Sequence, residues 1–321
     1  MLRRLWGDIP AWADPQHNPL LRYEYVRQQT GTSSAVWRVL GAVLSLSLLI
    51  LIGYAYSVLG FPNTSQAPYP LMLWRALIVP LIIVQVFTRA LATAFAFYIV
   101  PAERQRQTWD DRRATLNGAS LSIYSWWLAL LWRVRNLFIV GLVGRGLLLL
   151  GICYEVTRLH GAYLDLLTAR AIPAVPFLGG ILLLSAFLTG LIVLPLLLTG
   201  VDVALALWLS LWVRNRTLLS ILQTLIVSGQ ILLTLGLSAL SLQVITQDMP
   251  SGIYGTLIIG TSTLFADGGL MLAQLTQAGE LWARLPYGIL IGGVMIVWAL
   301  MQIALIRTIL RSAVQIAETG E

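Results

Sequence analysis

The stretch that decides the fold runs from Ala171 to Thr199, reads AIPAVPFLGGILLLSAFLTGLIVLPLLLT, and contains no charged side chain. A helix needs about 20 consecutive apolar residues to cross the hydrocarbon core of a bilayer, so this stretch predicts a membrane-spanning helix. We expect Pro195 to kink the helix, because proline lacks the amide donor that a helix interior requires. The continuation to Val213 includes Asp202, and we expect it to lie along the membrane interface.

The composition of the whole chain agrees with a lipid environment. Of its 321 residues, 58% are apolar and 11% are charged, and the mean hydropathy is +0.80. Soluble domains are nearer ~45–50% apolar and ~25% charged. A chain of this length has room for about six spans with their connections, which excludes a large extramembrane domain. We therefore predict an all-α, polytopic membrane protein.

Other apolar runs predict the remaining five spans. They are Val39 to Val58, Leu71 to Val100, Leu137 to Val156, Leu218 to Val244 and Tyr287 to Ile306. In the last of them, Gly288 and Gly292 form a GxxxG pair, which permits close approach of a neighbouring helix. These spans, with their connections, make residues 35–321 the transmembrane domain.

A shorter uncharged run, Gly252 to Ala266, precedes the last span. It is too short to cross the bilayer comfortably, and such segments are often re-entrant or interfacial. We predict that it forms a short re-entrant segment in an outer region covering about residues 250–285. The stretch Trp126 to Trp132 is expected to form an aromatic turn at the inner interface, before the third span.

Residues 1–34 differ from the rest of the chain because they are polar and rich in aromatic and arginine residues, such as Trp6, Tyr23 and Arg22. They contain no apolar core followed by a small-residue cleavage site, which argues against a signal peptide. This composition suits a helix that lies along the cytoplasmic membrane surface. A disordered tail is the alternative.

The cationic residues orient the predicted bundle. All 21 are arginine, and the net charge is +7. With both termini inside, cytoplasmic segments hold 15 arginines, outer loops hold three and spans hold three. This asymmetry follows the positive-inside rule and predicts six spans with both termini cytoplasmic, in the plasma membrane. Because the arginines flank apolar runs and form no single basic face, we expect lipid contacts and no nucleic-acid binding.

Signatures of catalysis are missing from the sequence. Without lysine the chain has no P-loop, and it contains neither HExxH nor GxSxG. His17, His160 and Cys153 leave little for a metal site. We therefore expect no enzyme activity and no cofactor in this chain, and an intramembrane enzyme is the least favoured of the functions considered.

Arg89, Arg145 and Asp202 are charged residues that fall inside predicted apolar segments. A charge in hydrocarbon is costly, so each must face protein or water. In one interpretation they line a path for an anionic or amphiphilic substrate. In the other, Arg89 or Arg145 pairs with Asp202 or Glu155, and we favour this because pairing offsets desolvation without a ligand.

The inner loop, about residues 101–122, is the other polar feature. It contains PAERQRQTWDDRRATL, in which charges of both signs are dense. Thr108 or Asn117 can cap a short helix, since their side-chain oxygens accept from free backbone amides. We predict a short helix on the membrane face that docks a soluble partner. A solvated loop that only orients its neighbours is the alternative.

Three stretches carry a family resemblance: NPLLRYE at 18–24, ERQRQTWD at 103–110 and LSLWVRNRT at 209–217. In this order they resemble ABC exporter permeases of the six-helix, type-2 class. The resemblance implies pairing with a second permease chain, identical or not, and with ATP-binding subunits that hold ATP and Mg. It also implies that Gly252 to Ala266 is an outer gate, and that a coupling helix touches the ATPase through Glu103, Arg104, Thr108 and Asp110.

The inner loop departs from the family pattern at two places. Gln107 stands where a glycine is usual, and Asp111, Arg112 and Arg113 replace an apolar run. We expect the permease subunit of an ATP-driven exporter for a hydrophobic or amphiphilic substrate. The alternative is a structural or accessory subunit of a larger membrane complex that does not transport.

Overall fold

The computed structural model describes residues 69–105, 109, 118–158, 171–245, 252–273 and 285–319. All regular structure in these ranges is helical. The predicted interfacial segment, residues 1–34, and the predicted span Val39 to Val58 lie outside the described residues. The fold is therefore all-α over the part of the chain that can be compared with the prediction.

Four helices are long and apolar enough to cross a membrane. A fifth candidate is the pair α6 and α7, which are bent by 54° relative to each other around Val134. Six crossings, counting Val39 to Val58, remain a prediction. The four long helices are α4 (Tyr69–Gln105), α9 (Phe177–Trp212), α10 (Arg216–Ile245) and α13 (Ile291–Thr319), and the bent pair is α6 (Gly118–Arg133) and α7 (Arg135–Arg158).

Two details of the predicted elements are wrong. Helix α9 continues without interruption to Trp212, so the segment after Thr199 is no separate interfacial piece. At 1.5 Å per residue its 36 residues extend about 54 Å, well beyond a hydrocarbon core of about 30 Å. The aromatic stretch Trp126 to Trp132 is no turn either, because it belongs to α6, which packs on α9 and α13.

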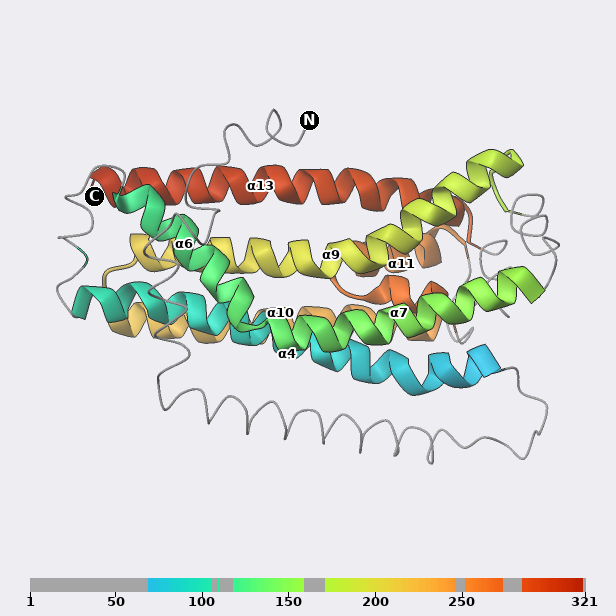
Figure 1. Cartoon of the computed structure of the whole chain (residues 1–321), viewed down its shortest axis with the longest axis horizontal. Helices are drawn as coiled ribbons and strands as arrows, with labels where there is room; N and C mark the ends of the chain where they lie inside the picture. Colours follow the sequence, from blue (N-terminus) through green and yellow to red (C-terminus); the bar gives the residue numbers. More distant parts are fainter. Residues whose placement is uncertain are drawn as a thin grey trace.

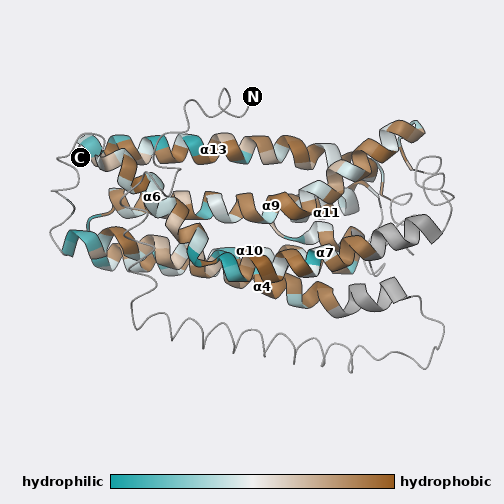
Figure 2. Cartoon of the chain, viewed as in Figure 1, coloured by the Kyte–Doolittle hydropathy of each residue, from teal (hydrophilic) through white to brown (hydrophobic). Residues whose placement is uncertain are grey.

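The helices lie side by side along the long axis of the molecule (Figure 1). Helix α9 packs between α13 and α4, while α7 and α10 pack on α4. The end of α4, the start of α6, the α9–α10 turn and the end of α13 meet at one end of the bundle (Figure 1). We call this the arginine-rich end, after Arg104, Arg214, Arg216 and Arg311. Figure 2 shows hydrophilic residues at this end of α4 and α13, and mostly hydrophobic ones along the helices.

Helices α9 and α13 approach each other closely at Gly292. A Cβ atom at this position would lie 2.1 Å from the Leu183 carbonyl oxygen and 3.0 Å from the Phe187 nitrogen. Both atoms belong to the backbone of α9, so no side-chain movement makes room. Gly292, the second glycine of the GxxxG pair, is therefore at a close helix contact, as the sequence predicts.

The short segment before the last span forms α11 (Ile253–Phe265), followed by the 3₁₀ helix η2 (Gly268–Ala273). Its flanking residues are Gly252 and Ala266, which are the predicted ends of the run. The 13 residues of α11 extend about 20 Å, too little to cross a hydrocarbon core of about 30 Å. Helix α11 packs along α10, and the chain turns back toward α13 through η2 and the 3₁₀ helix η3 (Gly288–Leu290).

Candidate functional site

Arg89 and Asp202 form an ion pair between α4 and α9. The Nε atom of Arg89 lies 2.6 Å from Oδ2 of Asp202, and Nη2 lies 3.3 Å from Oδ1. The side chains are only 7% and 12% exposed. Two parallel charge-assisted hydrogen bonds neutralise both groups inside the bundle. This is one of the pairings named from the sequence, and it lets α9 carry an aspartate through its apolar length.

The same guanidinium also reaches the end of α11. Its Nη1 atom donates to the Phe265 carbonyl oxygen at 3.0 Å and to Oγ1 of Thr234, on α10, at 3.3 Å. Carbonyl groups in the last turn of a helix lack intrahelical partners and carry partial negative charge. Arg89 therefore stabilises the C-terminal end of α11 while it pairs with α9.

Arg145 pairs with a residue that the sequence analysis did not name. Its Nη2 atom lies 2.6 Å from Oδ2 of Asp267, and both side chains are 5% exposed. Of the expected partners, Asp202 is paired with Arg89, and the side chain of Glu155 lies outside the described residues. The turn after α11 brings Asp267 to Arg145 instead. The sequence did hold a signal, since Asp267 is the only acidic residue between Asp248 and Glu280.

Arg145 also repairs the hydrogen bonding of α9 around Pro195. In a regular helix the Leu191 carbonyl would accept from the amide of residue 195, which proline lacks. The Nη1 atom of Arg145 donates to that carbonyl at 2.7 Å. The carbonyl of Pro195 itself accepts from Nε2 of Gln85 at 3.1 Å and from Oγ1 of Thr199 at 2.9 Å. These bonds allow α9 to continue through the proline.

Further contacts fix the end of α11 to its other neighbours. Trp298, on α13, donates from Nε1 to the Leu264 carbonyl at 2.9 Å, and its ring meets Phe265 edge-on at 4.9 Å. We call the contacts of Arg89, Arg145 and Trp298 with residues 264–267 the α11 anchor. The anchor joins α4, α7 and α13 to one short segment.

The predicted partner-coupling residues lie at the arginine-rich end as far as they are described. Glu103 is only 4% exposed. Arg104 donates from Nη2 to the Leu211 carbonyl, in the last turn of α9, at 2.8 Å. Two of the three family-like stretches thus meet, the one that contains Glu103 and the one that contains Leu211. Thr108 and Asp110 lie outside the described residues.

Trp109 attaches the inner loop to the bundle, and the sequence analysis did not single it out. Its side chain is buried and stacks on Trp126 of α6, with ring centroids 5.3 Å apart and an interplanar angle of 28°. It is the only large apolar residue between Glu103 and Arg113, which is the signal that could have identified it. Its burial gives this charged loop an apolar contact with the bundle.

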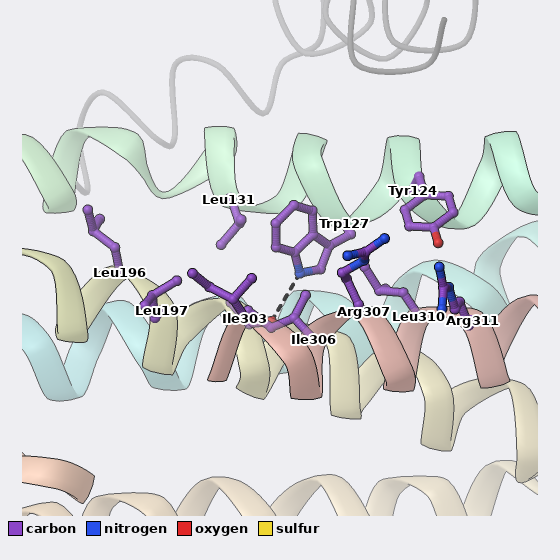
Figure 3. Close-up of a pocket in the computed structure, with 11 residues that line it drawn as sticks. Tyr124, Trp127, Leu131, Leu196, Leu197, Ile303, Ile306, Arg307, Leu310 and Arg311 are labelled. Carbon is purple, nitrogen blue, oxygen red and sulfur yellow. Dashed lines mark hydrogen bonds between the residues drawn. The ribbon is translucent and has the colours of Figure 1, made fainter. Parts of the chain in front are cut away.

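A pocket of about 420 Å³ lies between α6, α9 and α13 (Figure 3). Its walls are mostly apolar. Trp127 lies at the middle of the pocket, where its Nε1 atom donates to the Gly200 carbonyl at 3.0 Å. The sequence gives no sign of this pocket, because its walls come from three helices far apart in the chain. They consist of Tyr124, Trp127 and Leu131 on α6, Leu196, Leu197 and Gly200 on α9, and Ile303, Ile306, Arg307, Leu310 and Arg311 on α13.

The chemistry of these sites is electrostatic and mechanical. Among the residues that the structure describes, no group of three histidine, cysteine or acidic residues could hold a metal ion. The α11 anchor holds the C-terminal end of a short helix against three neighbouring helices. Comparison of the chain with protein-family models, curated proteins and solved structures finds no match.

Proposed function

We propose that this chain is the membrane-spanning permease subunit of an ATP-driven exporter of the ABC type. It works in the plasma membrane with both termini in the cytoplasm, beside a second permease chain. ATP, bound with Mg, is hydrolysed on a separate subunit, and the substrate is hydrophobic or amphiphilic. Support comes from the sequence resemblance and from one feature of the fold: α4 extends from the predicted ATPase contact to the α11 anchor.

A single helix, α4, contacts both regions that such a transporter must link. Near its C-terminal end it carries Glu103 and Arg104, which the resemblance assigns to the ATPase contact. Fourteen residues earlier it carries Arg89, which binds α9 and the end of α11. Those 14 residues of helix correspond to about 21 Å. A displacement applied to the inner loop would therefore reach the α11 anchor through one continuous helix.

The mechanism is a rigid-body movement between two states. In the state described here, Arg89 and Arg145 hold the segment after α11 in place. Nucleotide binding by the partner shifts α4 together with α7, which packs on it. The contacts of Arg89 with Phe265 and of Arg145 with Asp267 then break, and α11 moves as an outer gate. Small movements of helices at an interface are a common form of switching transition. The energy comes from the partner.

The first experiment is isolation of the chain from native membranes, followed by mass spectrometry of the proteins that accompany it. An ATP-hydrolysing subunit at equal stoichiometry supports the proposal. Respiratory or photosynthetic subunits in its place contradict it. They favour the accessory role, which has its own observation in its support: both buried arginines are neutralised within the chain and require no ligand.

Substitution of Glu103 tests the coupling directly. Glu103→Ala is expected to reduce ATP hydrolysis coupled to transport at least about tenfold, equivalent to ~1.4 kcal/mol, in proteoliposomes that contain the partner. Since Glu103 is buried, Glu103→Gln, which keeps the shape, separates loss of charge from loss of packing. Arg135→Gln, at an exposed position in the α6–α7 bend, is the control. Unchanged turnover and unchanged yield of the complex in both Glu103 variants would argue against coupling through this loop.

A further inference from the structure

The pocket between α6, α9 and α13 has its polar and apolar walls at opposite ends (Figure 3). Arg307 and Arg311 lie one turn apart on α13, and Tyr124 of α6 lies at the same end. Leu196 and Ile303 line the other end. Helices α9 and α13 run toward the arginine-rich end of the bundle and α6 runs away from it (Figure 1). Each of the three helices therefore places apolar pocket residues deeper in the bundle: Leu131 on α6, Leu196 on α9 and Ile303 on α13. Leu310 is the apolar residue that lies between the two arginines.

From this gradient we propose that the pocket binds one anionic lipid of the bilayer. Its phosphate lies at Arg307 and Arg311, and one acyl chain extends along the apolar wall. Guanidinium groups present forks of N–H donors that match phosphate oxygens. Basic pockets between membrane helices on the cytoplasmic side are a known type of site for anionic lipid headgroups. The inference does not rest on the proposed function, because it concerns binding by this chain alone.

The shape and lining of the pocket favour a lipid over a free anion. Its volume of about 420 Å³ is within the usual range of about 300–1,000 Å³ for ligand sites. Around Leu131 and Leu197 the walls offer water few partners, and ordered water needs two to four. The N–H group of Trp127 already donates to Gly200. At the middle of the pocket this side chain therefore offers a ligand its apolar ring and no free donor. An acyl chain fits this lining, whereas inorganic phosphate would leave it empty.

The position of the two arginines supports the same occupant. A guanidinium deep in hydrocarbon is costly, while arginine just beyond a membrane span can extend its charged head toward the interface. Arg307 directly follows the predicted span Tyr287 to Ile306. Arg311 is exposed and Arg307 is half-buried, as expected for groups that meet a headgroup at that depth. The predicted orientation puts this end on the cytoplasmic side. The lipid would then come from the cytoplasmic leaflet.

The test uses the full chain in phosphatidylcholine nanodiscs that contain a lipid with brominated acyl chains, either phosphatidylglycerol or phosphatidylcholine. Bromine quenches nearby tryptophan, and subtraction of the Trp127→Phe variant isolates the signal of Trp127. We expect brominated phosphatidylglycerol to quench Trp127 more strongly at equal mole fraction. Arg307→Gln combined with Arg311→Gln should reduce this preference on the order of 30-fold, taking about fivefold for each arginine. Arg214→Gln, at the same end outside the pocket, should leave it unchanged.

Lysine at both positions keeps the charge and is expected to retain most of the preference, which guards against a folding defect in the glutamine variant. Ile303→Phe, which fills the apolar end, should lower quenching by either lipid. Equal quenching of the unsubstituted chain by the two lipids would overturn the proposal, and so would a preference that survives the double glutamine substitution. Loss of the preference in millimolar inorganic phosphate would show a free-anion site. Absence of quenching by both lipids would show that another occupant fills the pocket.

Discussion

Arg145 satisfies two separate deficits of the bundle with one guanidinium. One of its nitrogens neutralises Asp267, and another donates to the Leu191 carbonyl that Pro195 leaves without a partner. A buried charge and a buried carbonyl are each expensive to leave unpaired. The residue is therefore more important for stability than an ordinary ion pair would be.

Arg145→Leu is expected to lower the free energy of unfolding by roughly 3 to 5 kcal/mol, because it leaves the Asp267 carboxylate buried and unpaired. Thermal unfolding of the purified chain in detergent measures the effect. Adding Asp267→Asn should recover only part of the loss, since the Leu191 carbonyl still lacks a donor. The control is Arg135→Gln, which removes a cation–π contact with Trp132 worth about 1 kcal/mol or less at an exposed site. Equal effects of Arg145→Leu and the control would contradict the role assigned to Arg145.

Sequence reasoning identified some residues of the site and not others, for a physical reason. Arg89, Arg145 and Asp202 could be recognised because a charge within an apolar run must find a partner. The identity of that partner depends on where the chain returns, and Asp267 lies 122 positions from Arg145. Trp109 was missed because it lies in a charged stretch. Such a stretch predicts solvent exposure, and a single aromatic residue does not change that prediction.

At the scale of elements, the contact between α9 and α13 depends on the absence of a side chain at Gly292. The neighbouring Gly293 offers a matched comparison, because a Cβ atom there would meet only Cδ2 of Leu183, at an ordinary 3.5 Å. The two positions are adjacent in the same helix, and the same substitution to alanine can be made at both. They differ in what the added Cβ atom would contact. They therefore isolate the effect of backbone contact.

Gly292→Ala is expected to force the two helices apart and to lower the unfolding temperature by a few degrees. A core change of about 2 kcal/mol shifts it by roughly 4 °C in chains of about 250 residues, and by somewhat less in a longer chain. Gly293→Ala should leave the temperature unchanged or raise it slightly, because alanine favours the helix by about 1 kcal/mol over glycine. Thermal unfolding and the yield of folded protein provide the comparison. Similar losses in both variants would mean that the close contact at Gly292 is unimportant.

Element boundaries followed from the sequence for α10 and α11, but α13 continues from Ile291 to Thr319, well past the predicted end at Ile306. The ends of α11 agree with the predicted run, and α10 begins two residues before Leu218. The prediction failed for α9, because Asp202 and Pro195 resemble interruptions in the sequence. In the fold both are compensated by arginines on other helices, and compensation of this kind is invisible along one chain segment.

For the molecule as a whole, the main regularity is that the end of α4, the α9–α10 turn and the end of α13, which carry arginines, gather at one end (Figure 1). The turn between α9 and α10 lies there, and the start of α9 lies at the opposite end (Figure 1). The positive-inside rule then predicts which end faces the cytoplasm. The structure alone gives the grouping, and the orientation requires an experiment.

Cysteine labelling tests that orientation in a Cys153→Ser background. Arg214→Cys, in the α9–α10 turn, should react with a membrane-impermeant maleimide only in inverted vesicles. Ala174→Cys, exposed just before α9, should react in intact cells. The reverse pattern would invert the predicted topology, and labelling of both from one side would show that α9 does not cross the membrane.

The way the turn after α11 is held has one more consequence. Two arginines from different helices bind it through separate contacts. Arg89 on α4 donates to the Phe265 carbonyl, and Arg145 on α7 donates to Asp267. Movement of either helix alone leaves the other contact intact, so the turn stays where it is until both have shifted. Gradual motion on one side would then be converted into an all-or-none response, and cooperativity would arise within a single polypeptide.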